Sequence, residues 1–274
     1  MREIKSGRPV FGGHEWGIFD MVGQFDPGLI VDVGAAVGHV TSHLLYRSPK
    51  SHAIAFEPFP GNWPHLEKTF AGKPATIVRS AVADVPGEMQ FALGPLAKSE
   101  GVWAEYEGYG PGGYIASKTE VLGEGKTINV PVTTLDDSVS ERILFLKIDV
   151  QGGELNVLRG AEKCFLRGID LLYVEFGGEK DILDFLFDRD YLIFDHKYTL
   201  MAAVGNPDYS FWDTVSDFKL STGYPARYAW PKVTPADPGE YCAMFSRQAP
   251  LIGHIFTDIV AVRRGLAERM GWAT

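Results

Sequence analysis

The sequence contains little cysteine, no long apolar run and no excess of positive charge. Its 274 residues include only Cys164 and Cys242, which are too few for a framework of several disulfides and are typical of reduced thiols. The formal net charge of −9 argues against a nucleic-acid partner, because phosphate binding requires a basic surface. No run of about 18 apolar residues is present to span a membrane, and Met1 to Trp16 lack the apolar core of a signal peptide. These absences predict a soluble, cytoplasmic protein that binds neither nucleic acid nor a membrane.

The sequence does contain short apolar runs that alternate with segments of helical periodicity, which is typical of a parallel sheet with helical crossovers. The predicted strands cover residues 29–33, 53–57, 75–79, 88–93, 143–149, 171–176, 191–195 and 255–262. The predicted helices cover residues 14–25, 38–47, 61–71, 154–166 and 179–188. Residues 94–128, with eight glycines, and residues 197–254, rich in Pro, Tyr and Trp, interrupt the alternation. Such long segments are usually functional or disordered, and their aromatic density argues against disorder.

A turn of small residues follows the first predicted strand. Leu29 to Val33 is apolar apart from Asp32, and the chain continues as Gly34-Ala35-Ala36-Val37-Gly38. Glu57 ends the next strand about 20 residues later, at the spacing of the acid that binds the ribose hydroxyls of an adenosine-containing cofactor. A dinucleotide fingerprint would also need glycine at positions 36 and 39, so the turn favours S-adenosylmethionine (SAM). Without Glu57, an ordinary strand and tight turn would explain the same residues.

A second informative segment runs from Ile143 to Glu154. Its nearly continuous apolarity predicts a strand buried on both faces, and Lys147 and Asp149, two residues apart, project from the same face. A Lys–carboxylate pair at the strand end is the purely structural interpretation. The functional interpretation places Asp149 at the carboxyl end of a central strand, where open α/β sheets bind ligands. Four acids that end predicted strands are then expected on one rim: Asp32, Glu57, Asp149 and Glu175.

Several ordered motifs together make the chain resemble the FkbM-type methyltransferases, a SAM-dependent family within the Rossmann-like class. The matching segments are VDVGAAVGHV at 31–40, AFEPFPGN at 55–62, SAVADVPGEMQF at 80–91, VTTLDD at 132–137, LKIDVQGGELNVLRGAE at 146–162 and VEF at 174–176. The chain departs from the family where Ala36 replaces a common Asn and Gln151 a usual Glu, whereas Glu154 is retained. The resemblance implies methyl transfer to an oxygen, often that of a sugar or natural-product hydroxyl.

The resemblance and the residues together give the fold and its divisions. We expect an α/β, Rossmann-like class I methyltransferase domain over residues 1–274, with a seven-stranded mixed sheet and helices on both faces. Residues 1–28 would form a helical lead-in and residues 29–196 the SAM-binding core. Residues 197–254 would form a cap or substrate lobe inserted before the last strand. Residues 255–274 would form an antiparallel closing strand over 255–262 and a C-terminal tail.

The predicted site combines a cofactor half, a reacting group and an acceptor pocket. SAM is expected to contact Asp32, Gly34, Ala35, Ala36, Gly38, His39, Glu57, Pro58, Phe59, Ser80, Ala81 and Asp149. Asp149 and His196 are competing candidates for the group that orients or deprotonates the acceptor hydroxyl, with Glu154 as a further catalytic candidate. The residues expected to contact the acceptor are Trp103, Tyr106, Glu175 and Trp212, although such aromatics can also seal a core or a dimer interface.

The resulting hypothesis is SAM-dependent O-methylation of a small hydroxylated acceptor. A nicotinamide-dependent oxidoreductase and a non-catalytic SAM-binding protein are the alternatives from other classes. No metal is expected, because His39 and His43 have no third ligand at a recognisable spacing. The sequence leaves the acceptor and the oligomeric state open, and a homo-oligomer is compatible with it.

Overall fold

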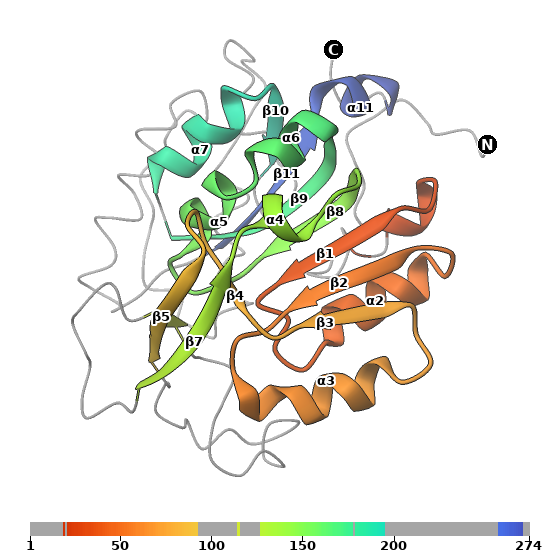
Figure 1. The fold of residues 1–274 in the computed structure, drawn as a ribbon. Helices are drawn as coiled ribbons and strands as arrows, with labels where there is room; N and C mark the ends of the chain where they lie inside the picture. Colours follow the sequence, from red (N-terminus) through yellow and green to blue (C-terminus); the bar gives the residue numbers. More distant parts are fainter. Residues whose placement is uncertain are drawn as a thin grey trace, which may run out of the picture. The chain divides into compact units, whose positions relative to one another are not determined.

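The computed structural model describes residues 19, 21–92, 114–115, 127–177, 179–194 and 257–270 (Figure 1). The chain divides into two compact units, Ile18–Asp170 and Leu171–Thr274, the second of which also includes Met1–Gly17. The predicted helix 14–25 is described only in part, where a 3-10 turn, η1 (Val22–Gln24), lies near its end. The predicted lobe 197–254 lies outside the described residues.

The unit Ile18–Asp170 contains four parallel strands with helical crossovers. Its main elements are β1 (Leu29–Val33), α2 (His39–Arg47), β2 (His52–Phe56), η2 (Pro60–Asn62), α3 (Trp63–Phe70), β3 (Ala75–Val78) and β8 (Ile143–Ile148). β1 pairs in parallel with both β2 and β8, and β2 pairs in parallel with β3. The register sets Asp32 beside Lys147 on adjacent strands. Two residues of opposite charge therefore face the same side of the sheet at neighbouring positions.

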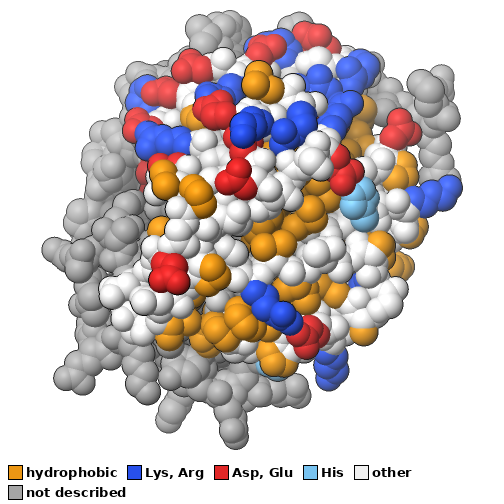
Figure 2. Space-filling model, viewed as in Figure 1, with side chains coloured by type: hydrophobic (Ala, Val, Ile, Leu, Met, Phe, Trp, Pro, Cys, Tyr) orange, Lys and Arg blue, Asp and Glu red, His pale blue; other side chains and the backbone are white. Residues whose placement is uncertain are grey.

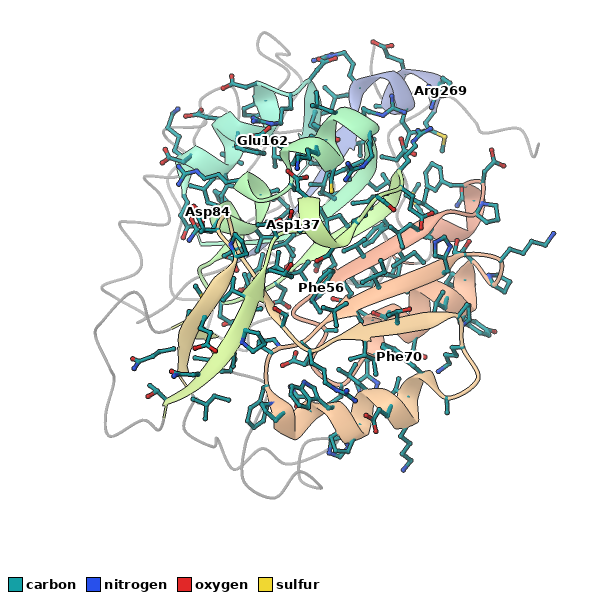
Figure 3. All side chains as sticks on the ribbon, viewed as in Figure 1. Phe56, Phe70, Asp84, Asp137, Glu162 and Arg269 are labelled. Atoms are coloured by element: carbon teal, nitrogen blue, oxygen red, sulfur yellow. The ribbon has the colours of Figure 1, made fainter. Side chains whose placement is uncertain are left out.

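The central strands of this unit are buried along their whole length. Every residue of β1 and of β8 is buried, as expected for parallel strands with both faces covered. Phe56 of β2 is fully buried, and Phe70 at the end of α3 packs with Ala55 and Leu66 (Figure 3). Burial of such a side chain contributes about 1.5–3 kcal/mol. This core holds the carboxyl ends of β1, β2 and β8 in fixed positions.

A second, four-stranded sheet in the same unit differs from the prediction. It has the order β4-β7-β5-β6, with β4 (Ala81–Val82), β5 (Gly87–Ala92), β6 (Tyr114–Ile115) and β7 (Thr127–Thr133). The predicted strand 88–93 is therefore present as β5 but pairs antiparallel with β7, outside the main sheet. β7 contains Pro131, which weakens a strand pattern because proline cannot donate to a ladder.

The predicted helix 154–166 is two short helices, α5 (Glu154–Arg159) and α6 (Glu162–Arg167). Gly160 separates them, and a Cβ atom there would lie 2.1 Å from the Ala83 carbonyl oxygen. Asp136, from α4 (Leu135–Ser138), accepts the backbone N–H groups of Lys163 and Cys164 and so caps the second helix. The break follows from close backbone packing and a distant cap, which periodicity alone does not reveal.

The second unit contains β9 (Ile169–Phe176), α7 (Lys180–Phe187), β10 (Tyr191–Phe194), β11 (Thr257–Arg263) and α11 (Arg264–Arg269). The first two residues of β9 belong to the other unit. β11 pairs antiparallel with both β9 and β10, which confirms the predicted antiparallel last strand. The hydrogen-bonded order of the large sheet is β10-β11-β9-β8-β1-β2-β3. This mostly parallel, seven-stranded order confirms the predicted Rossmann-like fold.

Candidate active site

The turn after β1 is built around residues with left-handed backbone conformations. Gly34 has φ 81°, Ala36 φ 49° and Gly38 φ 83°. A Cβ atom on Gly34 would lie 1.9 Å from the Asp149 carbonyl oxygen, and one on Gly38 would lie 2.7 Å from the Phe70 ring. Glycine is required at both positions by backbone conformation and by close approach. The small-residue turn predicted from the sequence is therefore packed directly against the segment that carries Asp149.

Glu57 joins this turn to the end of β2. Its Oε2 accepts the Ala36 N–H at 2.7 Å, and its Oε1 accepts the Phe59 N–H at 2.9 Å. Glu57 is 4% exposed, and burial raises its pKa to about 7 although the Phe59 and Ala36 N–H groups, Asn62 and Lys147 favour the ionised form. A carboxylate has about four acceptor positions. Glu57 therefore holds two turns together and still has acceptor capacity for a ligand.

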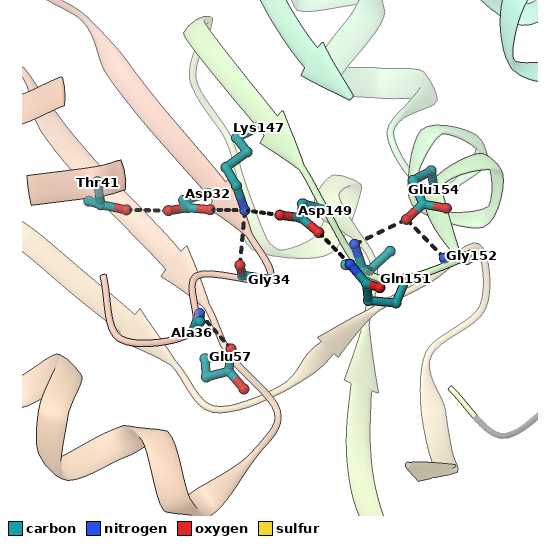
Figure 4. Close-up of polar contacts among 11 residues, drawn as sticks. Asp32, Gly34, Ala36, Thr41, Glu57, Lys147, Asp149, Gln151, Gly152 and Glu154 are labelled. Carbon is teal, nitrogen blue, oxygen red and sulfur yellow. Dashed lines mark hydrogen bonds and ion pairs between the residues drawn. The ribbon is translucent and has the colours of Figure 1, made fainter. Parts of the chain in front are cut away.

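Lys147 lies at the centre of a buried polar network (Figure 4). Its Nζ donates to the Gly34 carbonyl oxygen at 3.0 Å and lies 3.1 Å from Asp32 Oδ1 and 3.5 Å from Asp149 Oδ2. Burial disfavours the charge of Lys147, but Asp32 and Asp149 more than offset this effect and raise its pKa. Thr41 of α2 donates to the other Asp32 oxygen at 2.6 Å. The ammonium thus links the ends of β1 and β8 with the glycine turn.

The loop between β8 and α5 is held in one conformation by Glu154. Its Oε1 accepts the N–H groups of Val150 and Gly152 at 3.1 and 3.0 Å (Figure 4). Gln151 between them has φ 59°, and its Nε2 donates to Asp149 Oδ1 at 3.0 Å. Glu154 is buried, so the geometry gives this acid a loop-shaping task. The Asp149 side chain is 38% exposed, in contrast to the fully buried Asp32.

The structure brings most of the predicted cofactor residues to one end of the first unit. Asp32, Gly34, Ala36, Glu57 and Asp149 are connected through the contacts above. Ala35 donates its N–H to the Phe56 carbonyl, and His39 begins α2 directly after Gly38. These residues form the candidate cofactor site.

The remaining predicted residues have other surroundings. Phe59 packs against the core of the second sheet, and the Ser80 hydroxyl donates to the Pro131 carbonyl at 2.8 Å. Pro58 lies between Glu57 and Phe59, and Ala81 is buried in β4. Glu175 belongs to the other unit, where it lies near the end of β9 opposite Asp258. His196, Trp103, Tyr106 and Trp212 lie outside the described residues.

Sequence reasoning missed Thr41 and the contact of Gln151 with Asp149. Thr41 is a single hydroxyl on a helix, three residues after Gly38, and becomes recognisable only because α2 packs beside β1. Gln151 is recognisable as a departure from the family motif. Its contact with Asp149, however, depends on a left-handed backbone conformation that the sequence does not predict. Both residues complete hydrogen bonds of the acids that the sequence did identify.

Sequence comparisons relate the chain to known methyltransferases. The family model described as the methyltransferase FkbM domain matches residues 32–193, more than half of the chain. Methyltransferase 1 of Beauveria bassiana is 25% identical over 178 residues, which cover 57% of this chain and 68% of the relative.

Among solved structures, a methyltransferase FkbM from Methylobacillus flagellatus matches at 16% identity and TM-score 0.42. That match covers 65% of this chain and 44% of the other, so the chain spans less than half the length of that protein. The plantazolicin methyltransferase BpumL, solved with S-adenosylhomocysteine (SAH), is 9% identical with TM-score 0.39, over 90% of this chain and 80% of its own. From the match to the family model, the chain belongs to the FkbM methyltransferase family.

Proposed function

We propose that the protein transfers a methyl group from SAM to a hydroxyl oxygen of a small acceptor, such as a sugar or a natural product. The observation that carries this proposal is that Glu57 and Asp149, two acids with different surroundings, both contact the turn after β1. A buried Glu57 is tied to a glycine turn, and an accessible Asp149 is packed against the same turn. The first site suits a nucleoside and the second a reacting hydroxyl.

The residues of the turn fit an adenosine-containing cofactor. The Ala36 and Phe59 N–H groups and the Asn62 side chain leave about one of the four acceptor positions of Glu57 for a ribose hydroxyl. The residues from Gly34 to Gly38 carry no bulky polar side chain. Asp32, Gly34, Ala35, Ala36, Gly38 and His39 would lie along the cofactor's methionine side, and Pro58, Phe59, Ser80 and Ala81 along its adenine side. When bound, SAM supplies a methyl group on a positively charged sulfur, which an oxygen nucleophile attacks in line.

Asp149 would act on the acceptor by accepting a hydrogen bond from its hydroxyl. Lys147 and Gln151 hold the two oxygens of this carboxylate, so its direction is fixed before the acceptor arrives. Glu154 would support this arrangement by fixing the loop. His196 remains the competing proposal for the group that removes the hydroxyl proton, since its unperturbed pKa is about 6.5.

Acceptor recognition is assigned to aromatic residues and one acid. Trp103, Tyr106, Trp212 and Glu175 would line the pocket, because aromatic rings with polar edges suit amphipathic sugars. The acceptor is proposed to be a small molecule encountered in the cytoplasm, and a homo-oligomer is compatible with this activity.

In the described part of the chain no helix is long and apolar enough to cross a membrane. The face drawn in Figure 2 shows basic and acidic side chains intermingled among its described residues.

The proposal is tested by binding first and turnover second. Calorimetry should detect SAM and SAH but not NAD, since NAD would support the oxidoreductase alternative. Label from [methyl-¹³C]SAM should then appear on an oxygen of a compound in a panel of sugars and hydroxylated metabolites. SAM binding without transfer to any panel member would support a non-catalytic SAM-binding protein. No binding of SAM or SAH would contradict the proposal.

A further inference from the structure

We infer that Lys147 is a positioning residue that links the cofactor turn to Asp149, so that one ammonium sets the geometry of both halves of the site. This inference deepens the proposed function and rests on it. It assigns to Lys147 a task different from a plain ion pair at a strand end. The hydrogen bond and the two ion pairs of its ammonium carry the argument.

The contacts of Lys147 match the number of its donors. An ammonium has three N–H groups and no acceptor, and Lys147 Nζ has Gly34 O, Asp32 Oδ1 and Asp149 Oδ2 within 3.5 Å. The three acceptors come from the turn after β1, from β1 itself and from the loop after β8. A buried pair needs one partner for its charge, whereas this ammonium has partners in three segments. Movement of any one segment should therefore change the contacts of the ammonium with the other two.

The three acceptors of Lys147 differ in burial, so that one of them can hold the ammonium in place while the other two can contact ligands. Asp32 is fully buried and is also held by Thr41, so it anchors the ammonium. The Asp149 side chain is 38% exposed and is held by Gln151 from the other side. Gly34 lies in the turn where a cofactor is proposed to bind. The buried end is fixed, and the two partly exposed ends are those that ligands would contact.

The contact at Gly34 couples the link to the proposed cofactor. The Gly34 carbonyl accepts from Lys147, while the Gly34 N–H donates to the Phe56 carbonyl at 3.0 Å. Its left-handed conformation also places it directly against the Asp149 backbone. A ligand on the turn should therefore alter the electronic surroundings of the Lys147 ammonium, and through it those of Asp149.

The side-chain ammonium signal of Lys147 in ¹⁵N-labelled protein gives a direct test that needs no acceptor. Burial slows hydrogen exchange enough for such a signal to be observed, and Lys147→Arg assigns it by its loss. Asp149→Asn should shift this signal, whereas the matched change at exposed Asp84 should not. SAH should shift it as well. The inference would be overturned if the signal is absent or if it responds equally to both Asp variants. It would also be overturned if the signal does not respond to SAH that calorimetry shows to be bound. Failure of SAH to bind would instead contradict the proposed function, while the Asp149→Asn arm still tests the link.

A second test uses turnover with the acceptor that the labelled-methyl experiment identifies. At saturating SAM, Lys147→Arg should lower kcat about tenfold or more, because a planar guanidinium cannot replace three divergent donors. In the Asp149→Asn background the same substitution should change kcat little, since its effect acts through Asp149. Losses that add independently would contradict a positioning role for Lys147.

Discussion

The acids that follow β2 and β8 occupy different surroundings, although each ends a buried parallel strand. Glu57 is almost wholly buried, and its carboxylate is held by backbone N–H groups of two turns. Asp149 is partly exposed, and its carboxylate is held by the Lys147 ammonium and the Gln151 amide. The comparison shows that position at a strand end does not by itself assign a role. Burial and donor type separate an acid suited to recognising a ligand from one suited to meeting a reactant.

The largest expected effect comes from removing the cation that distinguishes the β8 end. Lys147→Met leaves Asp32 buried without its counter-ion, which should lower the free energy of unfolding by about 3–5 kcal/mol. Urea unfolding would measure it, with exposed Lys73→Met as the control. Asp32→Asn combined with Lys147→Met should recover part of the loss, because no buried charge then lacks a partner. Equal stability of wild type and Lys147→Met would show that the pair contributes nothing.

The next effect is a pH dependence of stability at the β2 end. Glu57 has a folded-state pKa of about 7, above its ordinary 4.5, so the folded state binds more protons than the unfolded state between these values. Proton binding by Glu57 therefore contributes to the free energy of unfolding, and this contribution is fully present below about pH 4.5. It amounts to up to about 3 kcal/mol and is lost as the pH rises through about 7. The difference in unfolding free energy between wild type and Glu57→Gln should favour wild type more at pH 5 than at pH 8. A difference independent of pH would contradict the raised pKa.

The reactive end is tested by Asp149→Asn, which keeps the size of the side chain and removes its charge. Turnover should fall roughly a hundredfold, since an oriented carboxylate contributes about that much, and SAM affinity should change little. Kinetics with the identified acceptor and calorimetry with SAM would separate the two effects. If His196 is the base, the wild-type rate should fall as the pH drops below about 6–7, because a protonated imidazole cannot accept the hydroxyl proton. Loss of this low-pH limb in His196→Ala, with normal turnover in Asp149→Asn, would assign the proton to His196.

The sequence predicts the parts of this molecule that depend on local pattern. The apolar runs give β1, β2, β3, β8, β9 and β10 nearly to their ends, and the acids after them mark the candidate site. The second sheet could not be found, because Pro131 obscures β7 and because β5 pairs with it across a long intervening segment. The tasks of Glu154 and Thr41 depend on tertiary contacts, since each becomes clear only from the backbone group or carboxylate that it faces. Pattern thus identifies the acids, and packing decides what each one does.

The cofactor assignment is tested most directly by calorimetric titration of SAM into wild type and Glu57→Ala. Loss of a hydrogen bond from a ribose hydroxyl to this carboxylate should cost about 1.5–3 kcal/mol, so the variant should bind SAM tens-fold more weakly. Glu67→Ala is the matched control, because this acid is exposed and contacts only Arg79 among the partners that the structure gives for its side chain. We predict that Glu67→Ala binds SAM with near-normal affinity and that a folded Glu57→Ala binds SAM tens-fold more weakly. Equal affinity of wild type and Glu57→Ala would contradict the role of Glu57 in holding the cofactor.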